Sequence, residues 1–420
     1  MDRRQFVQGA ATAYGLMIVK PETAFGYAAN SRVRYGLLGC GRRGTAVATS
    51  FAKNAGVEIV ALADIFPDQL ATAKTHFDAV NASLQLPPID SRRTFRGHDA
   101  SQAIAACKDV DAIQISTPPF FHVEHLETVT AAGKHAYCEK PVGVDIPQTK
   151  HALEIARRHD GKVSMAVGFQ IRSAPPFVEL VHRIHSGQIG KMAQIAAFYN
   201  APPAVMVDKG QPSSDEYRLR NWLLYRNLSG DMLLEQNIHV IDVCNWVMNA
   251  HPVSAFAKSS RKVVQSPGDT SDNYEVIFTY PGGVELSFSS TQFSKNNFFD
   301  VSERFFGSEG LAEAPYSGPL QIRGTQPWKW NAPVNATAGQ FAANGAFTDN
   351  LAEADAMKDR DFIQSIVSGK LQNQIAAGVD TARSCIMGRK AAETGRIVTW
   401  QEIEADTEAY SLGFNLSQFT

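Results

Sequence analysis

A glycine-spaced turn between a short apolar run and a helical pattern constrains this chain more than any other feature. Residues 34–38 (RYGLL) are typical of a buried strand, and residues 45–54 are typical of an Ala-rich helix. Between them, Gly39, Gly41 and Gly44 have the spacing that allows a tight turn, a close backbone approach and close packing of helix on strand. The free N–H groups at such a helix start bind phosphate, so we expect a dinucleotide pyrophosphate here. The residues expected to line it are Gly39, Cys40, Gly41, Arg42, Arg43 and Gly44.

An acidic residue at the end of the next expected strand indicates which dinucleotide binds. Residues 58–64 (EIVALAD) end on Asp64, twenty residues beyond Gly44. A carboxylate there accepts a hydrogen bond from a ribose 2′-hydroxyl and repels a 2′-phosphate, which favours NAD. NADP stays open, because Arg42 or Arg43 could attract a 2′-phosphate. The alternative is a glycine turn in some other α/β protein, with Asp64 at a solvated strand end.

The order of expected elements predicts two domains. Strands alternate with helices as far as residue 168, which favours a parallel sheet covered on both faces, as in a Rossmann domain. Longer strand-like runs with few helices follow, which favours an α+β domain built on a large, mostly antiparallel sheet. The expected boundaries are 1–29 for a signal peptide, 30–168 for the Rossmann domain and 169–420 for the second domain, whose last helices return to the first.

Individual elements are expected at definite positions. Strands are predicted at residues 111–116, 135–138, 163–167, 193–199, 274–280, 284–291 and 298–306. Helices are predicted at residues 67–77, 101–107, 147–159, 175–186, 231–248, 359–369 and 379–395. Residues 85–97 are expected to form a loop, and residues 312–345 a long excursion rich in Ala, Asn, Gly and Pro.

Composition excludes several classes of protein. The 420 residues are 44% hydrophobic and 20% charged, which is ordinary for a soluble globular enzyme. A formal net charge of −2, with no basic cluster among aromatic residues, argues against a nucleic-acid partner. No apolar run reaches the length of a membrane span. The five cysteines are scattered without CxxC spacing, so neither a metal site nor a disulfide framework is expected.

The N-terminus is typical of an export signal. Arg3 and Arg4 precede Phe6, a mildly apolar stretch covers residues 7–19, and small residues surround position 28. This pattern resembles a twin-arginine signal, which carries folded proteins to the periplasm; the alternative is an ordinary basic, disordered N-terminus. Because the periplasm holds almost no free nicotinamide nucleotide, an exported enzyme of this kind must keep its cofactor bound and regenerate it in each cycle.

An acidic residue and a histidine share one face of the expected helix 231–248. Glu235 and His239 are four residues apart, and apolar neighbours bury much of this helix. Both side chains could point into a cleft. The alternative is a helix-surface pair that contributes a few tenths of a kcal/mol.

Several motifs together resemble the Gfo/Idh/MocA oxidoreductase family over residues 32–402. They are Thr117-Pro118 with His122, the run Ala132-Gly133-Lys134-His135, the run Glu139-Lys140-Pro141, and the helix with an acidic residue four before a histidine. The resemblance implies that Lys140 is the catalytic lysine, hydrogen-bonded to the hydroxyl being oxidised, and that His239 exchanges its proton. It also implies that Thr117, Pro118, His122, Glu139 and Lys140 lie against the cofactor.

The chain departs from the family pattern in the helix that is expected at residues 231–248. Glu235 stands where many members have Asp, and Asn237 where many have Gly. Gln170, Arg172, Trp222 and Asn237 are the candidate substrate-binding residues; for Arg172 and Gln170, packing at the domain junction is the alternative, and for Trp222 an ordinary polar helix.

Two functions are expected to compete. The first is an NAD-dependent sugar or polyol oxidoreductase with a tightly bound cofactor, similar to the periplasmic glucose–fructose oxidoreductase branch. The second is a redox-assisted glycosidase or lyase, in which NAD oxidises a ring carbon transiently and the product shows no net redox change. The resemblance also implies a homodimer or homotetramer formed through a sheet face.

Overall fold

The computed structural model describes residues 32–203, 206–207, 209, 211, 214–295, 298–331 and 349–419. The twin-arginine segment lies outside these residues, so the export signal stays a prediction. Of the helices in the described ranges, none is long and apolar enough to cross a membrane.

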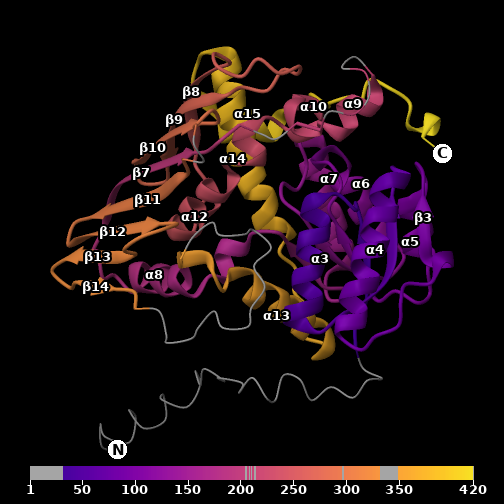
Figure 1. The fold of residues 1–420 in the computed structure, drawn as a ribbon. Coiled ribbons are helices and arrows are strands. Elements are labelled where there is room, and N and C mark those ends of the chain that lie inside the picture. Colours follow the sequence, from indigo (N-terminus) through magenta and orange to yellow (C-terminus); the bar gives the residue numbers. More distant parts are fainter. Residues whose placement is uncertain are drawn as a thin grey trace, which may run out of the picture. The chain divides into compact units, whose positions relative to one another are not determined.

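Six parallel strands form the first sheet (Figure 1). Their order is β3-β2-β1-β4-β5-β6, so the direction of strand addition reverses between β1 and β4. Open sheets of this kind bind ligands beyond the carboxyl ends of the strands at the reversal, which is where residues 39–44 lie. The strands are β1 (Arg34–Leu38), β2 (Glu58–Asp64), β3 (Thr94–Arg96), β4 (Ala112–Ile115), β5 (His135–Cys138) and β6 (Met165–Val167).

Helices pack on both faces of this sheet, because alternate strand residues belong to two separate apolar clusters. Leu37 joins the cluster with Phe51 and Phe77, whereas its neighbour Leu38 joins the cluster with Leu126 and Ile155. The fold is therefore a doubly wound Rossmann domain, as expected. The helices are α3 (Arg42–Ala55), α4 (Pro67–Ser83), α5 (Ala100–Ala106), α6 (His122–Ala131) and α7 (Ile146–His159).

A nine-stranded sheet forms the second domain and stands apart from the first sheet (Figure 1). Its order is β14-β13-β12-β11-β7-β10-β9-β8-β15, and of its pairs only β7 with β10 is parallel in the described part of the chain. Side chains alternate between buried and exposed along β9, so one face is packed and the other is open. The strands are β7 (Met192–Asn200), β8 (Ser254–Ser260), β9 (Asn273–Tyr280), β10 (Val284–Thr291), β11 (Asp300–Gly307), β12 (Gly310–Pro315), β13 (Gln321–Gly324), β14 (Trp328–Lys329) and β15 (Val398–Thr399).

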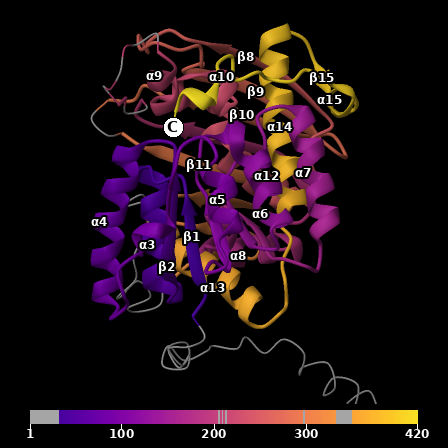
Figure 2. The same ribbon diagram turned by 90° about the vertical axis from the view of Figure 1, so that its right-hand side faces the viewer.

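Helices lie between the two sheets (Figure 1), and α14 stands beside α7 of the first domain (Figure 2). The buried helix α14 packs closely at two glycines: a Cβ at Gly378 would lie 2.9 Å from Val142, and one at Gly388 2.9 Å from Leu233. Helix α13 returns to the first domain, where the ring of Phe362 lies 5.9 Å from that of Phe51. The helices are α8 (Pro175–His185), α9 (Asp215–Arg220), α10 (Arg226–Ser229), α11 (Met232–Glu235), α12 (Ile238–Met248), α13 (Ala354–Val367), α14 (Ile375–Thr394) and α15 (Trp400–Ala405).

The prediction of one continuous helix over residues 231–248 is wrong, because the helix breaks at Gln236 and Asn237. The Asn237 N–H bonds to the carbonyl of Met232, five residues back, at 3.1 Å. The hydroxyl of Ser290 on β10 donates to Asn237 Oδ1 at 2.9 Å, which ties the break to the sheet. Such a widened turn is common at functional sites.

Two further predictions are corrected. Strand β3 and the 3-10 turn Ser91–Arg93 lie within the expected loop 85–97, and strand β8 was not expected. Residues 312–331 are not a featureless excursion, because β12 continues to Pro315 and is followed by β13 and β14. The remainder of that excursion, up to residue 345, lies almost entirely outside the described residues.

Candidate active site

The glycine turn after β1 has the shape of a phosphate cradle. Gly39 has φ +95°, and a Cβ there would lie 2.6 Å from the carbonyl of Ser116. A Cβ at Gly44 would lie 2.0 Å from the carbonyl oxygen of Gly39, so only glycine lets α3 start this close to β1. Gly41, by contrast, faces open space and precedes a first helical turn with no side-chain cap and no acidic residue. The N–H groups of this turn therefore fit an anion.

Asp64 lies beside this turn at the end of β2. Its Oδ2 accepts a hydrogen bond from the Cys40 N–H at 2.6 Å, and its Oδ1 accepts one from the Phe66 N–H at 2.8 Å. Burial raises the pKa of Asp64 to about 6, although both hydrogen bonds favour the ionised form. Each oxygen keeps a lone pair, so the carboxylate can still accept a hydroxyl group.

Arg43 pairs with a buried acidic residue that follows β5. Its Nε and Nη2 each lie 3.2 Å from Oε1 of Glu139, which is buried after β5. Its positive charge also contributes to lowering the pKa of His239. Arg42, the other candidate for a 2′-phosphate, is exposed.

His122 joins two loops that follow the neighbouring strands β4 and β5. One ring nitrogen lies 2.8 Å from the carbonyl oxygen of Thr117 and the other 2.8 Å from that of Pro141. Burial lowers the pKa of His122, so the neutral ring donates to one carbonyl at a time. Pro118 follows Thr117 and leads into the short turn Pro119–Phe121. The role of His122 in this structure is to hold the loops after β4 and β5 together.

Lys140 and Glu235 form an ion pair where the two domains meet. Lys140 Nζ lies 2.5 Å from Glu235 Oε1 and also donates to the backbone carbonyl of Glu235. Both side chains are 11% exposed, so the pair is largely shielded but still open to a ligand. The structure thus pairs Glu235 with Lys140, instead of with His239 on a helix surface.

His239 lies in the first turn of α12, beside this pair. Burial, together with the charges of Lys140 and Arg43, lowers the pKa of His239 well below its ordinary value, so the ring is neutral. Its Nδ1 is buried, and among the residues that the structure describes it has no hydrogen-bond partner. The ring of Phe169 packs edge-on at 6.1 Å. A neutral imidazole with a free nitrogen can accept a proton.

The expected substrate-binding residues fall into two groups. Asn237 is fully buried with Nδ2 unpaired, and Gln170 is buried with Oε1 unpaired, in both cases counting only partners within the described ranges. The guanidinium of Arg172 is already paired, because its Nε and Nη2 lie 2.8 and 2.9 Å from the carboxylate oxygens of Asp242. This pairing favours a role for Arg172 in packing at the domain junction. Trp222 is half-buried in a 3-10 turn before α10.

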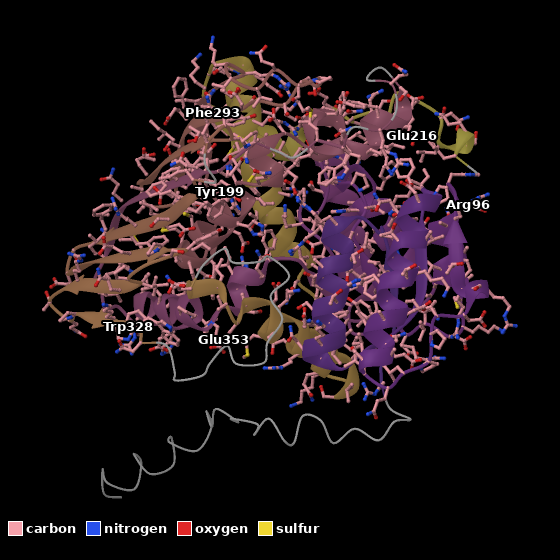
Figure 3. All side chains as sticks on the ribbon, in the orientation of Figure 1. Arg96, Tyr199, Glu216, Phe293, Trp328 and Glu353 are labelled. Carbon is pink, nitrogen blue, oxygen red and sulfur yellow. The ribbon has the colours of Figure 1, made fainter. Side chains whose placement is uncertain are left out.

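Trp328 and Trp330 belong to the far edge of the second sheet. Trp328 lies on β14, well away from Tyr199 on β7 (Figure 3). The Arg183 guanidinium lies 4.6 Å from its ring centroid. Trp328 therefore packs against Arg183 at this edge of the sheet.

A C-terminal segment that packs against Phe66, close to Asp64, was missed by the sequence reasoning. We call residues 406–419 the C-terminal clasp. Phe419 packs edge-on against Phe66 with centroids 5.9 Å apart, and its carbonyl accepts the His98 N–H at 3.1 Å. Arg220 covers the other side of Phe66, with its guanidinium 3.8 Å from the ring centroid. The alternation of apolar residues at 410, 412, 414 and 416 was the available signal of an extended, packed segment.

Comparisons with known proteins agree with this geometry. Residues 33–167 match the family model described as "Oxidoreductase family, NAD-binding Rossmann fold", and residues 177–313 match "GFO/IDH/MocA C-terminal domain". The chain is 28% identical over 292 residues to an inositol 2-dehydrogenase of Rhizobium meliloti, covering 69% of this chain and 78% of that one.

Solved structures share the fold. A levoglucosan dehydrogenase in complex with NADH and L-sorbose has a TM-score of 0.70 at 20% identity, covering 89% of this chain and 100% of that one. An aldose–aldose oxidoreductase from Caulobacter crescentus in complex with glycerol has a TM-score of 0.66 at 18% identity, covering 88% and 99%.

Proposed function

This chain belongs to the Gfo/Idh/MocA oxidoreductase family, and we propose that it oxidises a carbinol of a sugar, polyol or sugar derivative with tightly bound NAD. The observation that carries the proposal is the Lys140–Glu235 pair beside a neutral His239, at the carboxyl edge of a sheet with a phosphate-binding turn. Proteins similar to this chain include enzymes named for inositol and levoglucosan, both polyhydroxylated rings.

The chain's own residues account for binding and proton transfer. The turn 39–44 holds the pyrophosphate, and Asp64 accepts the ribose hydroxyl. When bound, the nicotinamide ring supplies the hydride acceptor. Lys140 Nζ donates a hydrogen bond to the substrate oxygen while Glu235 holds the ammonium in place. His239, which is neutral, takes up the hydroxyl proton as the carbonyl forms.

The proposal favours NAD over NADP. A buried carboxylate at Asp64 repels a 2′-phosphate, and Arg43 is engaged with Glu139 at the other end of the cleft. Arg42 and Arg43 were the two residues that could attract the 2′-phosphate of NADP, and of these only Arg42 is exposed.

Tight retention of the cofactor is supported by the C-terminal clasp. Asp64 is 8% exposed, and Phe66 beside it is packed between Phe419 and Arg220. For the adenosine half of NAD to be released, the contacts of Phe66 with Phe419 and Arg220 would have to separate. Retention in turn suits the expected periplasmic location, where lost cofactor is not replaced.

We further propose a homo-oligomer formed through the open face of the second sheet. Three large apolar side chains are exposed on neighbouring or nearby strands: Phe256 on β8 (40%), Ile277 on β9 (48%) and Phe306 on β11 (36%). Exposed apolar groups that recur across one face are typical of an interface. Light scattering on the purified protein measures the number of copies.

One observation favours the redox-assisted glycosidase or lyase as the second candidate. Glu235 places a carboxylate at the reaction site that could remove a proton from the carbon beside a transient ketone. The two candidates differ in their products, since only the oxidoreductase yields a net redox change.

The test begins with the nucleotide. The mature protein is purified and denatured, and any released nucleotide is identified by mass spectrometry. Near-stoichiometric NAD supports the proposal; protein without nucleotide would refute tight retention. The loaded protein is then given sugars, and the products are analysed for net oxidation, which the oxidoreductase requires and the lyase does not.

A further inference from the structure

Arg389 on α14 is a charged side chain that the fold buries almost completely, at 1% exposure. Burying a charged group costs free energy unless the group is paired and hydrogen-bonded. The contact of Arg389 with Glu393 is loose, since Nε lies 3.8 Å from Oε1, and Nε has no hydrogen-bond partner within the described ranges. Other contacts of the guanidinium must therefore offset the cost of burial.

Those contacts are two backbone carbonyls that share one nitrogen of Arg389. Nη1 donates to the Gly230 carbonyl at 2.8 Å and to the Val144 carbonyl at 3.1 Å. Val144 is the fourth residue after Lys140, and Gly230 is the fifth residue before Glu235. A single nitrogen thus joins the loop that follows Lys140 to the turn that precedes Glu235.

The loop that contains Val144 is fixed on its other sides as well. The Val144 N–H donates to Gln148 Oε1 at 3.0 Å, and Asp145 Oδ1 accepts the Gln148 N–H at 2.9 Å. The C-terminal clasp adds a further bond, because the Tyr410 N–H donates to Asp145 Oδ2 at 2.8 Å. The ring of Tyr410 also covers Arg389, with its centroid 4.9 Å from the guanidinium carbon. The loop, the arginine and the clasp are therefore packed together.

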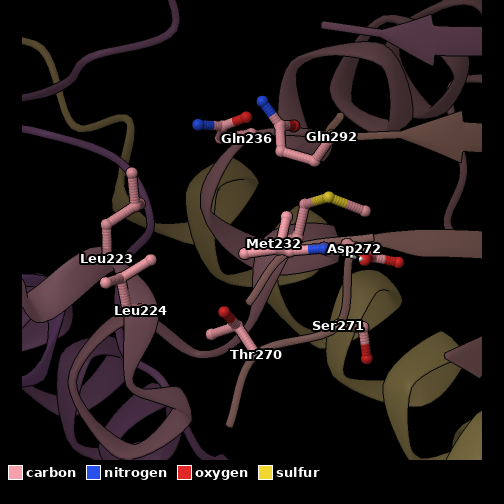
Figure 4. Close-up of a pocket in the computed structure, with 9 residues that line it drawn as sticks. Leu223, Leu224, Met232, Gln236, Thr270, Ser271, Asp272 and Gln292 are labelled. Carbon is pink, nitrogen blue, oxygen red and sulfur yellow. Dashed lines mark hydrogen bonds between the residues drawn. The ribbon is translucent and has the colours of Figure 1, made fainter. Parts of the chain in front are cut away.

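Helix α11, which carries Glu235, depends on contacts at its start. It is a single turn, which is too short to be stable by itself. One of its sides borders a cavity of about 30 Å³, with room for a water molecule or two (Figure 4). Asp231 Oδ1 accepts the Ser271 N–H at 2.9 Å, and Arg389 binds the carbonyl of the preceding residue, Gly230. Asp231 and Arg389 together fix the start of the helix.

We propose that Arg389 is a positioning residue, which keeps the Lys140 ammonium and the Glu235 carboxylate paired by fixing the two segments that carry them. It acts through the backbone carbonyls of Val144 and Gly230. The inference rests on the proposed function in one respect, since it gives the Lys140–Glu235 pair a part in turnover.

The test measures how fast acetic anhydride labels Lys140, by mass spectrometry of the peptide that contains it. In the wild type, Lys140 Nζ is 11% exposed and lies against Glu235, which shields it from the reagent. Arg389→Met removes the N–H donors and keeps a long side chain, whereas Arg389→Lys keeps the charge and a donor. The matched control is Arg383→Met, which removes another buried arginine of α14, whose Nε donates to Thr149 on α7 at 3.0 Å.

Each substitution is made alone and together with Glu235→Gln. Urea unfolding establishes that each variant folds, and the rates are compared at equal nucleotide occupancy, determined by mass spectrometry of the released nucleotide. If Arg389→Met does not fold, Arg389→Gln replaces it, because this shorter amide cannot reach both carbonyls.

Arg389→Met is expected to raise the labelling rate of Lys140 by at least about tenfold, the scale of one lost hydrogen bond from a charged group, and Arg389→Lys by less. The increase should vanish beside Glu235→Gln, because the pair is then already broken. An unchanged rate in Arg389→Met, an equal rise in Arg383→Met, or a rise that persists beside Glu235→Gln would overturn the proposal.

Activity separates this inference from the proposed function. With a sugar that reduces the bound nucleotide, Arg389→Met should lower the reduction rate at saturating sugar by at least about tenfold and leave the nucleotide bound. A wild-type reduction rate in this variant would overturn the inference. The expected labelling pattern, together with no reduction by any sugar in the wild type, would instead count against the proposed function and leave the positioning of the pair standing.

Discussion

A buried carboxyl group on β11 makes the stability of this protein depend on pH in a way that can be measured. Glu303 is fully buried between neighbouring strands, and neither of its carboxyl oxygens has a hydrogen-bond partner within the described ranges. Burial raises the pKa of Glu303 well above its ordinary value. The nearby hydroxyl of Tyr316 is likewise buried and unpaired among those residues. We therefore expect Glu303 to be protonated in the folded protein at neutral pH.

The magnitude follows from linkage. In the unfolded chain Glu303 ionises near its reference pKa of about 4.3, while in the fold it keeps its proton. A raised folded pKa contributes stability that is present below the unfolded pKa and is lost as the pH rises towards the folded pKa. Each pH unit between the unfolded and the folded pKa is worth up to about 1.36 kcal/mol, so the wild type loses stability through this group as the pH rises from 5 to 7.

The test uses the substitution Glu303→Met, because the Met side chain has a shape similar to that of Glu and carries no ionisable group. Urea unfolding of both proteins at pH 5 and pH 7 gives the difference between them, in which every other titrating group cancels. We expect the advantage of the variant to grow from pH 5 to pH 7, by up to about 1.36 kcal/mol for each pH unit. Glu285→Met, on the exposed face of β10, is the control and should show almost no pH-dependent change.

A pH-independent difference between the Glu303→Met variant and the wild type would refute the reasoning. It would mean that Glu303 has an ordinary pKa in the fold, and hence a charged or hydrogen-bonded partner that stabilises its carboxylate.

Three further predictions concern other parts of the structure. Lys140→Ala should lower turnover by at least about 10²-fold while mass spectrometry still finds bound nucleotide; activity near wild type would remove Lys140 from the mechanism. NAD affinity should weaken as the pH falls through about 6, the pKa to which burial raises Asp64, and the affinity of Asp64→Asn, followed by fluorescence titration, should be weaker but flat with pH. Asp359→Ala should destabilise the fold by about 3 kcal/mol in urea unfolding, because buried Lys358 loses the carboxylate 2.7 Å from its Nζ; a loss below about 1 kcal/mol would show that Asp355 alone compensates.

The sequence predicted the fold where local patterns and tertiary structure agree. The strand 284–291 and the strand 135–138 were predicted with the bounds that the structure has, because each is a compact apolar or alternating run between turn residues. The glycine turn could be predicted for the same reason, since its spacing encodes local backbone geometry.

Features that depend on distant contacts could not be predicted. The helix break at Asn237 is held by Ser290, which is far away in the chain. The helical spacing predicted that Glu235 and His239 share one face of a helix. Only the fold shows that the Glu235 carboxylate lies across the domain boundary, against Lys140. The pairing of Arg172 with Asp242 likewise joins segments that no local pattern connects.

The position of the C-terminal clasp in the chain has a consequence for assembly. Residues 406–419 follow every strand of both sheets, so during synthesis they leave the ribosome after the glycine turn and Asp64 can already have folded. Until then Phe66 lacks the contact with Phe419, and the end of β2 beside Asp64 is less covered. Under the proposed function, nucleotide would meet a more open site during that interval, and the synthesis of residues 406–419 would close it. Cofactor loading would then be timed by translation itself.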